Sequence, residues 1–303
     1  MTSLPTVKLH TGAEVPALGF GTWQIDPWEV AEAVKAALEA GYRHIDCAEG
    51  YYNEAQIGEV FAEQFKSGKL KRKDLFITSK VWGTNFDIVE ERLKNTLKEL
   101  QVDYLDLYLL HCPTSFERTN LGFPAMGKNG EWKRGKTPIH VVWKQLESFV
   151  DQGLVKAIGI SNFPCLLLND LLTYARIQPA VHQIEVHPYF TNEKLSKWCR
   201  ANGIVITGFS PLGSGKKGGP MEDTVIQEIA KKHKVTPAQV LIRWSSQLGN
   251  VVLAKSKTPE RIKQNLASFS FTLTEEEMKQ ITELNKNWKV CDHAVEFGIP
   301  VYD

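Results

Sequence analysis

Short apolar runs alternate with helical repeats along this chain, at intervals of roughly 30 residues, and this alternation narrows the choice of fold more than any other feature. For example, Val89, Leu93 and Leu97 lie at helical spacing, and the apolar run 105–110 follows them. Eight runs are predicted to be strands: 17–20, 42–45, 75–79, 105–110, 155–160, 180–185, 204–209 and 251–254. Strands that alternate with helices in this way are typical of parallel βαβ units.

Polar side chains follow nearly every one of these strands, with Asp46, Lys80 and His111 as the first examples. A closed (β/α)₈ barrel gathers the carboxyl ends of all its strands around one mouth, where its active sites are built. A doubly wound sheet instead binds ligands chiefly at one switch point. Ligand-type residues after most strands therefore favour an α/β fold of the TIM-barrel type.

Both ends of the chain add to this barrel. Residues 6–16 have the pattern of a β-hairpin with its turn at 10–13, and we expect it to cover the bottom of the barrel. From residue 285 onward the periodicity is lost, which predicts an irregular C-terminal tail. Trp288, Phe297 and Tyr302 are the aromatic residues of this tail that we expect to fold over the mouth.

Composition and charge exclude several classes of protein. With 303 residues, 43% of them hydrophobic, and no low-complexity linker, residues 1–303 are expected to form a single domain. A net charge of +1 and a pI near 7.6 argue against a nucleic-acid partner.

No apolar run approaches the ~18 residues of a membrane span, and residues 1–10 lack a signal-peptide pattern. Five cysteines without a CxxC pair are expected to be reduced thiols. We therefore expect a cytoplasmic monomer.

Asp46, Tyr51, Lys80 and His111 combine an acid, a phenol, an ammonium and an imidazole close to strand ends. Reduction of a carbonyl by hydride leaves an alkoxide, so a proton donor must stand beside the oxygen. Tyr51 is the candidate donor, because the Lys80 ammonium, kept charged by Asp46, would lower its usual pKa of about 10. His111 would hydrogen-bond the carbonyl oxygen and orient it. Taken singly, the same residues also fit a structural ion pair, a loop aromatic and a satisfied histidine.

Four segments resemble the signature segments of the aldo-keto reductases: DCAEGYYNE at 46–54, LYLLH at 107–111, GISNF at 159–163 and KSKTPER at 255–261. The resemblance runs from Lys8 to Tyr302, in the same order and at matching spacing. It implies a (β/α)₈ barrel that reduces aldehydes or ketones to alcohols with NADPH, without a metal or a flavin. The four residues of the proton-transfer set would then be its catalytic residues.

The resemblance also implies a coenzyme site. The resemblance places Ser161, Asn162 and Gln183 at the nicotinamide carboxamide and stacks Phe209 on the nicotinamide ring. It places Ser210, Leu212 and Ser214 near the pyrophosphate, and Lys255, Ser256, Thr258, Arg261, Gln264 and Asn265 at the adenosine end. Gly21, Thr22 and Asp46 complete the predicted site. Lys255 and Arg261 place two cations beside a helix that opens at Pro259, a favourable position for a 2′-phosphate. A solvated basic face is the alternative for Lys255. NADPH rather than NADH is the expected coenzyme.

Substrate contacts follow from the same resemblance. The candidate substrate-binding residues are Trp23, Tyr51, Trp82, His111 and Cys112, with Phe116, Phe123 and Trp132 as further candidate pocket walls. Ordinary loop packing is an equally good explanation of these aromatic residues. The long connection 112–138 is the expected source of selectivity for a small carbonyl substrate. Phe209 stands where many members have tyrosine, Cys112 where some have tryptophan, and His182 where asparagine is common, so the preferred substrate stays open.

Two patterns suggest other sites but fail in context. Residues 213–218 satisfy G-x-G-x-x-G, yet Gly219 and Pro220 separate them from the next helix, so we expect a flexible flap and not a Rossmann turn. His182, Glu185 and His187 suggest metal ligands, but strand alternation sends residues 182 and 185 to opposite faces. No metal site is therefore expected.

Two other functions stay open. The first is a non-enzymatic NADPH-binding barrel, such as a channel-associated subunit or a structural protein, and the intact set of four polar residues argues against it. The second is a hydrolase, and the lack of a convincing metal site or nucleophile–base pair argues against that.

Overall fold

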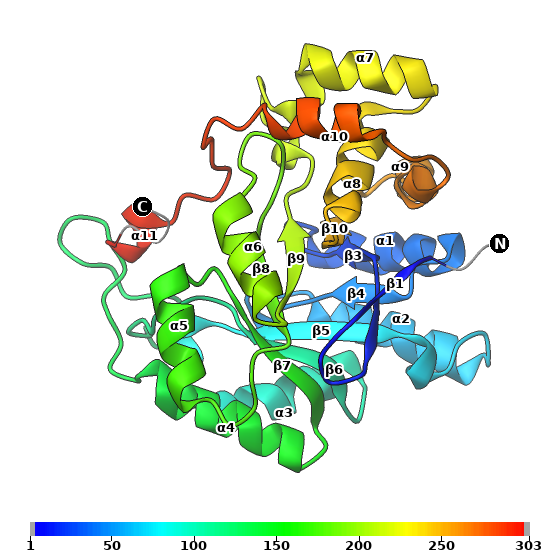
Figure 1. Cartoon of the computed structure of the whole chain (residues 1–303). Helices are drawn as coiled ribbons and strands as arrows, with labels where there is room; N and C mark the ends of the chain where they lie inside the picture. Colours follow the sequence, from blue (N-terminus) through cyan, green and yellow to red (C-terminus); the bar gives the residue numbers. More distant parts are fainter. Residues whose placement is uncertain (1–3, 300–303) are drawn as a thin grey trace. The chain divides into compact units, whose positions relative to one another are not determined.

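The computed structural model describes residues 4–299, in which eight strands form a closed barrel (Figure 1). The barrel strands are β3 (Leu18–Gly21), β4 (His44–Asp46), β5 (Phe76–Val81), β6 (Leu105–Leu110), β7 (Val155–Ser161), β8 (Val181–Glu185), β9 (Val205–Phe209) and β10 (Val251–Ala254). Their order around the barrel follows the chain, and β10 closes the ring by pairing in parallel with β3. The predicted TIM barrel is confirmed.

The N-terminal hairpin is also confirmed. Strands β1 (Thr6–Lys8) and β2 (Glu14–Pro16) form a separate antiparallel sheet. The backbone N–H of Leu9 donates to Ala13 O at 2.8 Å, and Gly12 adopts a φ of 87° that glycine accommodates without strain. The expectation that this hairpin covers the bottom of the barrel stays a prediction.

The described chain divides into two compact units. The first unit comprises residues 4–46 and 183–291, and the second unit comprises residues 47–182 and 292–299. Strands β3, β4, β9 and β10 belong to the first unit, β5 to β7 belong to the second, and β8 begins in the second and ends in the first. That residues 1–303 act as a single domain stays a prediction.

Helices of the first unit pack on one another and on the barrel strands. Helix α1 (Pro27–Ala40) contacts α9 (Pro259–Leu266), and α8 (Pro237–Gln247) contacts α7 (Thr224–His233) and β10. Helix α6 (Glu193–Ala201) lies against β9, and α10 (Glu275–Thr282) lies against α7. Capping boxes satisfy the first-turn N–H groups of α8 and α10, from Thr236 with Gln239 and from Thr274 with Glu277. The sequence carries a signal for each start: Thr236 followed by Pro237, and Thr274 followed three residues later by Glu277.

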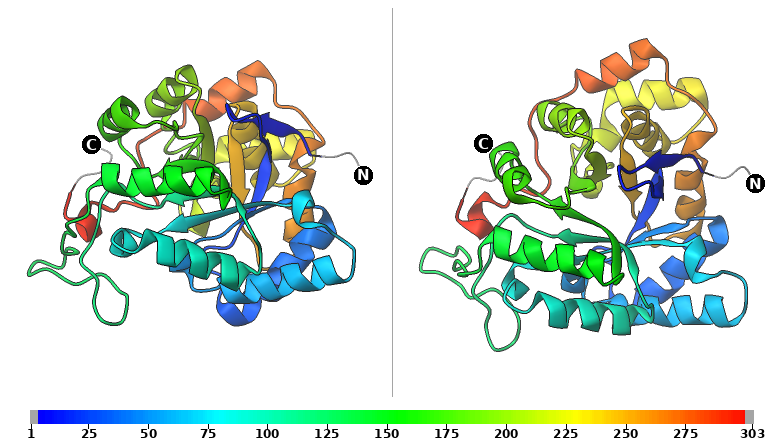
Figure 2. Two further views of the ribbon diagram at one scale, coloured as in Figure 1. Left: turned by 90° about the horizontal axis from the view of Figure 1, so that it is seen from below. Right: turned by 60° about the horizontal axis from the view of Figure 1, so that its bottom comes forward.

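In the second unit, four helices pack on one another in chain order (Figure 2). They are α2 (Glu54–Lys66), α3 (Val89–Leu100), α4 (Ile139–Asp151) and α5 (Cys165–Tyr174). Helix α3 contacts β5, and α4 contacts β7. Helices α2 and α3 approach closely at Gly58, where an added Cβ would lie 1.9 Å from Glu99 O. Glycine is required there because any side chain would collide with that backbone. This close packing brings polar side chains of α2 and α3 up to β5.

A long connection, residues 111–138, follows β6 in the second unit. It is folded back on itself through antiparallel bridges between Phe116 and Arg134 and between Met126 and Trp132. The predicted irregular tail contains one short helix, α11 (Ala294–Phe297), which lies beside this connection (Figures 1 and 2). Phe297 packs on Phe116 with ring centroids 4.9 Å apart. Tyr302, the last aromatic residue of the predicted tail, lies outside the described residues.

Two further observations concern the chain as a whole. All five cysteines fall in the described part of the chain and are free thiols. Within residues 4–299, no helix combines the length and the apolar character needed to cross a membrane.

Candidate active site

Lys80 and Tyr51 form the centre of the candidate site, and both belong to the second unit. The Lys80 Nζ donates to Tyr51 Oη at 3.0 Å and to Cys47 O at 2.8 Å. Lys80 lies near the carboxyl end of β5 and is fully buried, so its ammonium depends on such oxygen acceptors. Its ammonium also lies 4.7 Å from the centre of the Tyr51 ring. The predicted phenol–ammonium contact is therefore present.

The backbone of the η1 turn (Glu49–Tyr51) holds Tyr51 at this place. It is a single 3₁₀ turn in which Tyr51 N donates to Ala48 O at 3.0 Å. Tyr52 ends the turn with a φ of 55°, a left-handed conformation that costs free energy for a non-glycine residue. The Tyr52 side chain is 63% exposed, whereas Tyr51 is half-buried. The turn therefore sends two adjacent phenols into different surroundings.

His111 lies directly after β6 and beside Tyr51. Their ring centroids are 5.5 Å apart in an edge-to-face arrangement. Burial lowers the pKa of His111 well below its usual value, and the charges of Lys80 and His293 lower it further. The imidazole is therefore neutral at physiological pH. Among the residues that the structure describes, its buried Nδ1 has no hydrogen-bond partner.

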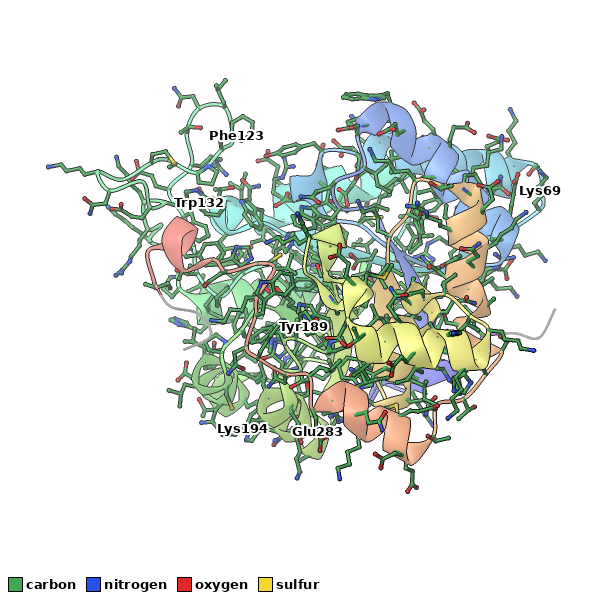
Figure 3. All side chains as sticks on the ribbon, turned by 90° about the horizontal axis from the view of Figure 1, so that it is seen from above. Lys69, Phe123, Trp132, Tyr189, Lys194 and Glu283 are labelled. Atoms are coloured by element: carbon green, nitrogen blue, oxygen red, sulfur yellow. The ribbon has the colours of Figure 1, made fainter. Side chains whose placement is uncertain are left out.

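Aromatic rings surround His111 in the same unit. Trp82 lies 4.7 Å from the His111 ring and 5.8 Å from Trp132. Trp132 in turn packs on Phe116 at 5.0 Å and on Phe297 at 5.4 Å. Figure 3 shows Trp132 next to α11. These rings form one continuous aromatic wall. It includes the tail residue Phe297, whose contacts with Phe116 and Trp132 were not predicted from the sequence.

Three other candidate substrate contacts have different surroundings. Phe123 is 52% exposed and packs on Tyr52 at 6.0 Å. Cys112 is fully buried, donates to Thr114 O at 3.2 Å, and burial raises its pKa to about 12. Trp23 belongs to the first unit and is 41% exposed. Their roles in substrate binding stay predictions.

Asp46, the fourth residue of the predicted catalytic set, ends β4 in the first unit. Its Oδ1 accepts a hydrogen bond from Gln183 Nε2 at 2.8 Å, and its carbonyl oxygen accepts one from Thr22 Oγ1 at 2.8 Å. Hydrogen bonds within the first unit thus join three predicted site residues: Asp46, Gln183 and Thr22. Gly21 precedes them, at the end of β3, and is buried.

Ser161 and Asn162 follow β7 in the second unit. The Asn162 Nδ2 donates to His111 O at 3.0 Å and to Ser161 Oγ at 3.1 Å. Asn162 has a φ of 62°, a conformation that asparagine tolerates better than most residues. This predicted carboxamide-binding pair is thus joined to the strand end that carries His111.

The residues predicted to hold the adenosine end lie after β10 in the first unit. Lys255, Thr258, Arg261 and Gln264 are exposed, and Asn265 is buried. Thr258 is the N-cap of α9, but its side chain does not cap the helix; instead, its N–H donates to Ser256 Oγ at 3.1 Å. Two exposed cations beside a helix start with no side-chain cap suit a phosphate group. The donor set therefore fits a 2′-phosphorylated coenzyme.

The segment after β9 is also in the first unit. Phe209 and Ser210 are half-buried, and Ser210 Oγ lies 3.1 Å from Ser214 Oγ. The glycine-rich residues that follow form a short 3₁₀ turn, η4 (Gly213–Gly215), and helix α7 starts only at Thr224. The sequence G-x-G-x-x-G therefore does not open a helix, as predicted. Leu212 is half-buried in this segment.

The other suspected site comprises His182, Glu185 and His187. Among the described residues, no group of three or more potential metal ligands is found. His187 Nε2 and Glu185 Oε1 are 2.8 Å apart and fully buried, and the Glu185 carboxylate also accepts from the N–H groups of Val290 and Cys291. His182 Nε2 accepts from Phe163 N at 3.1 Å. Each of these groups therefore has a structural partner.

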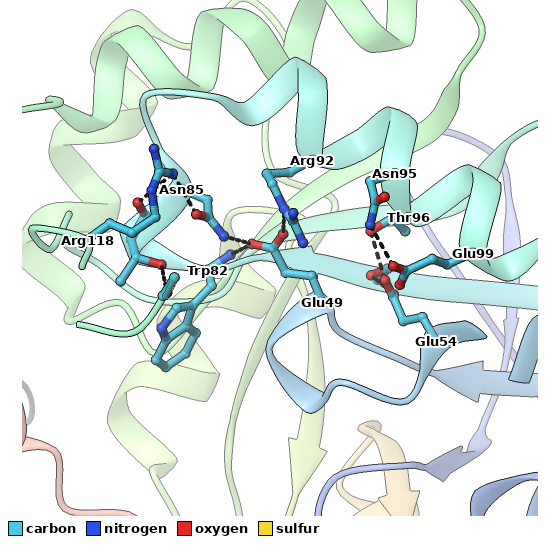
Figure 4. A network of polar contacts seen from close by, with 12 residues as sticks. Glu49, Glu54, Trp82, Asn85, Arg92, Asn95, Thr96, Glu99 and Arg118 are labelled. Carbon is cyan, nitrogen blue, oxygen red and sulfur yellow. Dashed lines mark hydrogen bonds and ion pairs between the residues drawn. The ribbon is translucent and has the colours of Figure 1, made fainter. Parts of the chain in front are cut away.

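A buried polar network beside the candidate site was not predicted (Figure 4). Glu49 accepts hydrogen bonds from Trp82 N, Asn85 and Arg92. Glu54 accepts from Ser79 at 2.5 Å and from Thr96 at 2.9 Å, and burial raises its pKa to about 7. The sequence carries one signal of this network: Arg92 adjoins Leu93 of the apolar stripe of α3, so its charge lies close to the buried face of the helix.

Comparisons with known proteins agree with this geometry. The family model described as the aldo/keto reductase family matches residues 17–286. Aldo-keto reductase family 1 member A1 of Gallus gallus is 45% identical over 293 residues, which cover 93% of this chain and 89% of that protein. The protein of the same name from Homo sapiens is 44% identical over 293 residues, with 93% and 90% covered.

Solved structures give the same result. The aldose reductase from Schistosoma japonicum matches with a TM-score of 0.92 and 40% identity, over 99% of this chain and 98% of that one. The aldose reductase from Giardia lamblia matches with a TM-score of 0.91 and 38% identity, over all of both chains. The chain belongs to the aldo-keto reductase family. Membership supports an oxidoreductase that acts on small carbonyl compounds.

Proposed function

We propose that this protein reduces aldehydes or ketones to alcohols with NADPH, and that Tyr51 donates the proton. The observation that carries the proposal is the 3.0 Å contact between Lys80 Nζ and Tyr51 Oη at a buried strand end. A cation at this distance favours the phenolate over the phenol, so it makes Tyr51 a stronger acid. The phenol can then give up its proton as negative charge develops on the substrate oxygen.

His111 has a different role in this proposal. Because its pKa is well below the usual value, the ring is neutral at pH 7 and is no source of positive charge. A neutral imidazole donates one hydrogen bond and accepts another. We propose that it donates to the carbonyl oxygen and so fixes the oxygen beside Tyr51, against the wall that Trp82 forms. Asp46 would keep Lys80 charged.

The coenzyme would be held at its adenosine end and at its nicotinamide end by the residues predicted for each. Bound NADPH supplies the hydride. Lys255 and Arg261 would pair with the 2′-phosphate, with Ser256, Thr258, Gln264 and Asn265 around the adenosine. Ser161, Asn162 and Gln183 would bind the carboxamide, Phe209 would stack on the ring, and Gly21, Thr22, Ser210, Leu212 and Ser214 would line the remaining length.

The test is an assay of NADPH oxidation, followed by absorbance, with a panel of aldehydes, aldoses, ketosteroids and 2-oxo compounds. We expect turnover of at least one aldehyde class, with a preference for NADPH over NADH. A purified protein that binds NADPH tightly but reduces none of the panel would contradict the proposal. That result would favour the alternative of a non-enzymatic NADPH-binding barrel.

We further propose a cytoplasmic, monomeric protein of one domain with no membrane or nucleic-acid partner. Its free thiols, three of them on the buried residues Cys47, Cys112 and Cys199, suit a reducing compartment. Size-exclusion chromatography with light scattering checks the oligomeric state. A mass of twice the chain's 34.2 kDa would contradict the monomer.

A further inference from the structure

Glu49 carries a carboxylate that is bonded on both oxygens inside the second unit (Figure 4). Its Oε1 accepts from Trp82 N at 2.5 Å and from Asn85 Nδ2 at 3.0 Å. Its Oε2 accepts from Arg92 Nε at 2.6 Å. Only 2% of the Glu49 side chain is exposed, compared with 29% of Arg92. A buried carboxylate with this many charge-assisted bonds fixes the groups around it strongly.

These bonds join the two segments that carry the candidate proton donor and its cation. Glu49 starts the turn that ends with Tyr51. Trp82 follows Lys80 by two residues, and its N–H is the group that Glu49 binds. The Lys80–Tyr51 contact lies between the same two segments, so the carboxylate ties them together at a second point.

The same bonds also fix the aromatic wall. The Trp82 ring lies 4.7 Å from the His111 ring, so a shift of the Trp82 backbone moves the surface beside the imidazole. The neighbouring Gly83 leaves no room for such a shift, because an added Cβ would lie 2.6 Å from both Cys112 Sγ and Thr114 O. Glu49 and this close packing hold the segment after β5 from two sides.

We propose that Glu49 is a positioning residue: its carboxylate sets the distance between Tyr51 and Lys80 and the place of Trp82 beside His111. This inference rests on the proposed function, since it assigns Glu49 a task in that reaction. Glu49 itself touches none of the reacting groups. It acts through the backbone of Trp82 and through the turn that ends with Tyr51.

Asp106, on β6, offers a matched control because it binds the amino-terminal end of β5. Asp106 is a buried carboxylate whose Oδ2 accepts from Ile77 N at 2.9 Å and from Arg72 Nη2 at 2.7 Å. It thus combines one backbone N–H of β5 with one arginine, as Glu49 does for the segment after β5. Ile77 is the second residue of β5, and the amino-terminal face of such a barrel contributes to stability, not to catalysis.

The experiment compares Glu49→Ala, Glu49→Gln, Asp106→Ala and Tyr51→Phe in the full-length protein. A displacement of about 1 Å costs about 10²-fold in rate, so we expect Glu49→Ala to lower kcat by about 10- to 100-fold. The dissociation constant of NADPH should stay within about twofold of the parent value, because its proposed phosphate ligands are elsewhere. Glu49→Gln keeps an oxygen for Trp82 N and should recover most of the rate. Asp106→Ala should lower the melting temperature and keep kcat within about twofold.

Hydrogen exchange of the backbone amides provides a readout that does not need turnover. Glu49→Ala should speed exchange in residues 49–53 and 80–85, and Asp106→Ala should not. Folded Glu49→Ala with parental kcat, or equal losses of kcat in Glu49→Ala and Asp106→Ala, would overturn the inference, as would unchanged exchange in both segments. If Tyr51→Phe keeps its turnover, the proposed function fails, and the exchange data still decide whether Glu49 orders these segments.

Discussion

The groups proposed for proton transfer and those proposed for the coenzyme phosphate are built in opposite ways. In the second unit, Lys80 is fully buried and Tyr51 and Cys47 bind its ammonium before any substrate is considered. In the first unit, Lys255 lies exposed before α9 and Arg261 lies exposed in its first turn. Preorganised donors cost no reorganisation during a reaction, whereas exposed cations attract a charged ligand and are screened by salt. The difference predicts that mutations in the two regions separate turnover from coenzyme binding.

The largest expected effect tests the buried side of this comparison. Tyr51→Phe removes the proposed proton donor and keeps the ring, so turnover should fall by ~10²–10⁴-fold, as is typical for a lost general acid. NADPH affinity should barely change. The neighbouring, exposed Tyr52 provides the control, because Tyr52→Phe should keep the parental rate. Steady-state kinetics with a saturating aldehyde measure both. More than half of the parental turnover in Tyr51→Phe would refute the assignment.

The second-largest effect concerns Glu54, a buried acid that follows the η1 turn in the chain. Burial raises the pKa of Glu54 from its ordinary 4.5 to about 7. Between these two values the folded protein keeps a proton that the unfolded chain has released, so the free energy of unfolding should fall as pH rises through this window. The total change is about 3 kcal/mol, and it is complete above the raised pKa.

Glu54→Gln should remove this pH dependence, because an amide is neutral throughout and can still bond Ser79 and Thr96. Urea unfolding of the parent and the variant at about pH 5 and about pH 7.5 measures the change, and the difference between the proteins cancels other titrating groups. A parent and a variant with the same pH dependence would show that Glu54 ionises normally. Turnover at neutral pH should be unaffected, which would separate stability from catalysis within one unit.

The third effect tests the exposed side of the comparison. Arg261→Ala removes one charge-assisted partner of the 2′-phosphate, so NADPH binding should weaken by about 1.5–3 kcal/mol, or roughly 10- to 150-fold. NADH binding should stay nearly the same, and turnover at saturating NADPH should be little changed. Lys263→Ala, on the same helix, is the control. Fluorescence titration decides the matter, because an equal loss for both coenzymes would mean that Arg261 has a structural role.

Most of the fold could be read from the sequence because its signals are local. The run 105–110 coincides with β6, and the predicted repeat from Val89 coincides with the start of α3. The Thr236–Pro237 pair, a sequence signal for a helix start, coincides with the start of α8. Each depends on residues a few positions apart, whose backbone conformation their own side chains largely determine.

The network around Glu49 could not be predicted for the opposite reason. Its partners Trp82 and Arg92 lie 33 and 43 residues away, and no periodic pattern reports such a pairing. The contact of Phe297 with Trp132 spans a still longer stretch and depends on how the tail returns to the connection after β6. Strand ends identify candidate residues, but side-chain packing alone decides which of them meet.

The smallest effect concerns the glycine-rich flap after β9, residues 211–220. Gly213, Gly215 and Gly218 all have positive φ. Ordering this glycine-rich segment costs more conformational entropy than ordering a segment of the same length without glycines. The flap is tied within the first unit by Lys216 Nζ, which donates to Val290 O at 2.8 Å. Such an exposed bond contributes about 0.5–1.5 kcal/mol, so Lys216→Ala should speed release of NADP⁺ by about 2- to 10-fold. Lys217→Ala is the control and should change little. In the parent protein, stopped-flow measurements should already show release faster than hydride transfer; release that limits turnover would mean that the flap closes more firmly than its glycines predict.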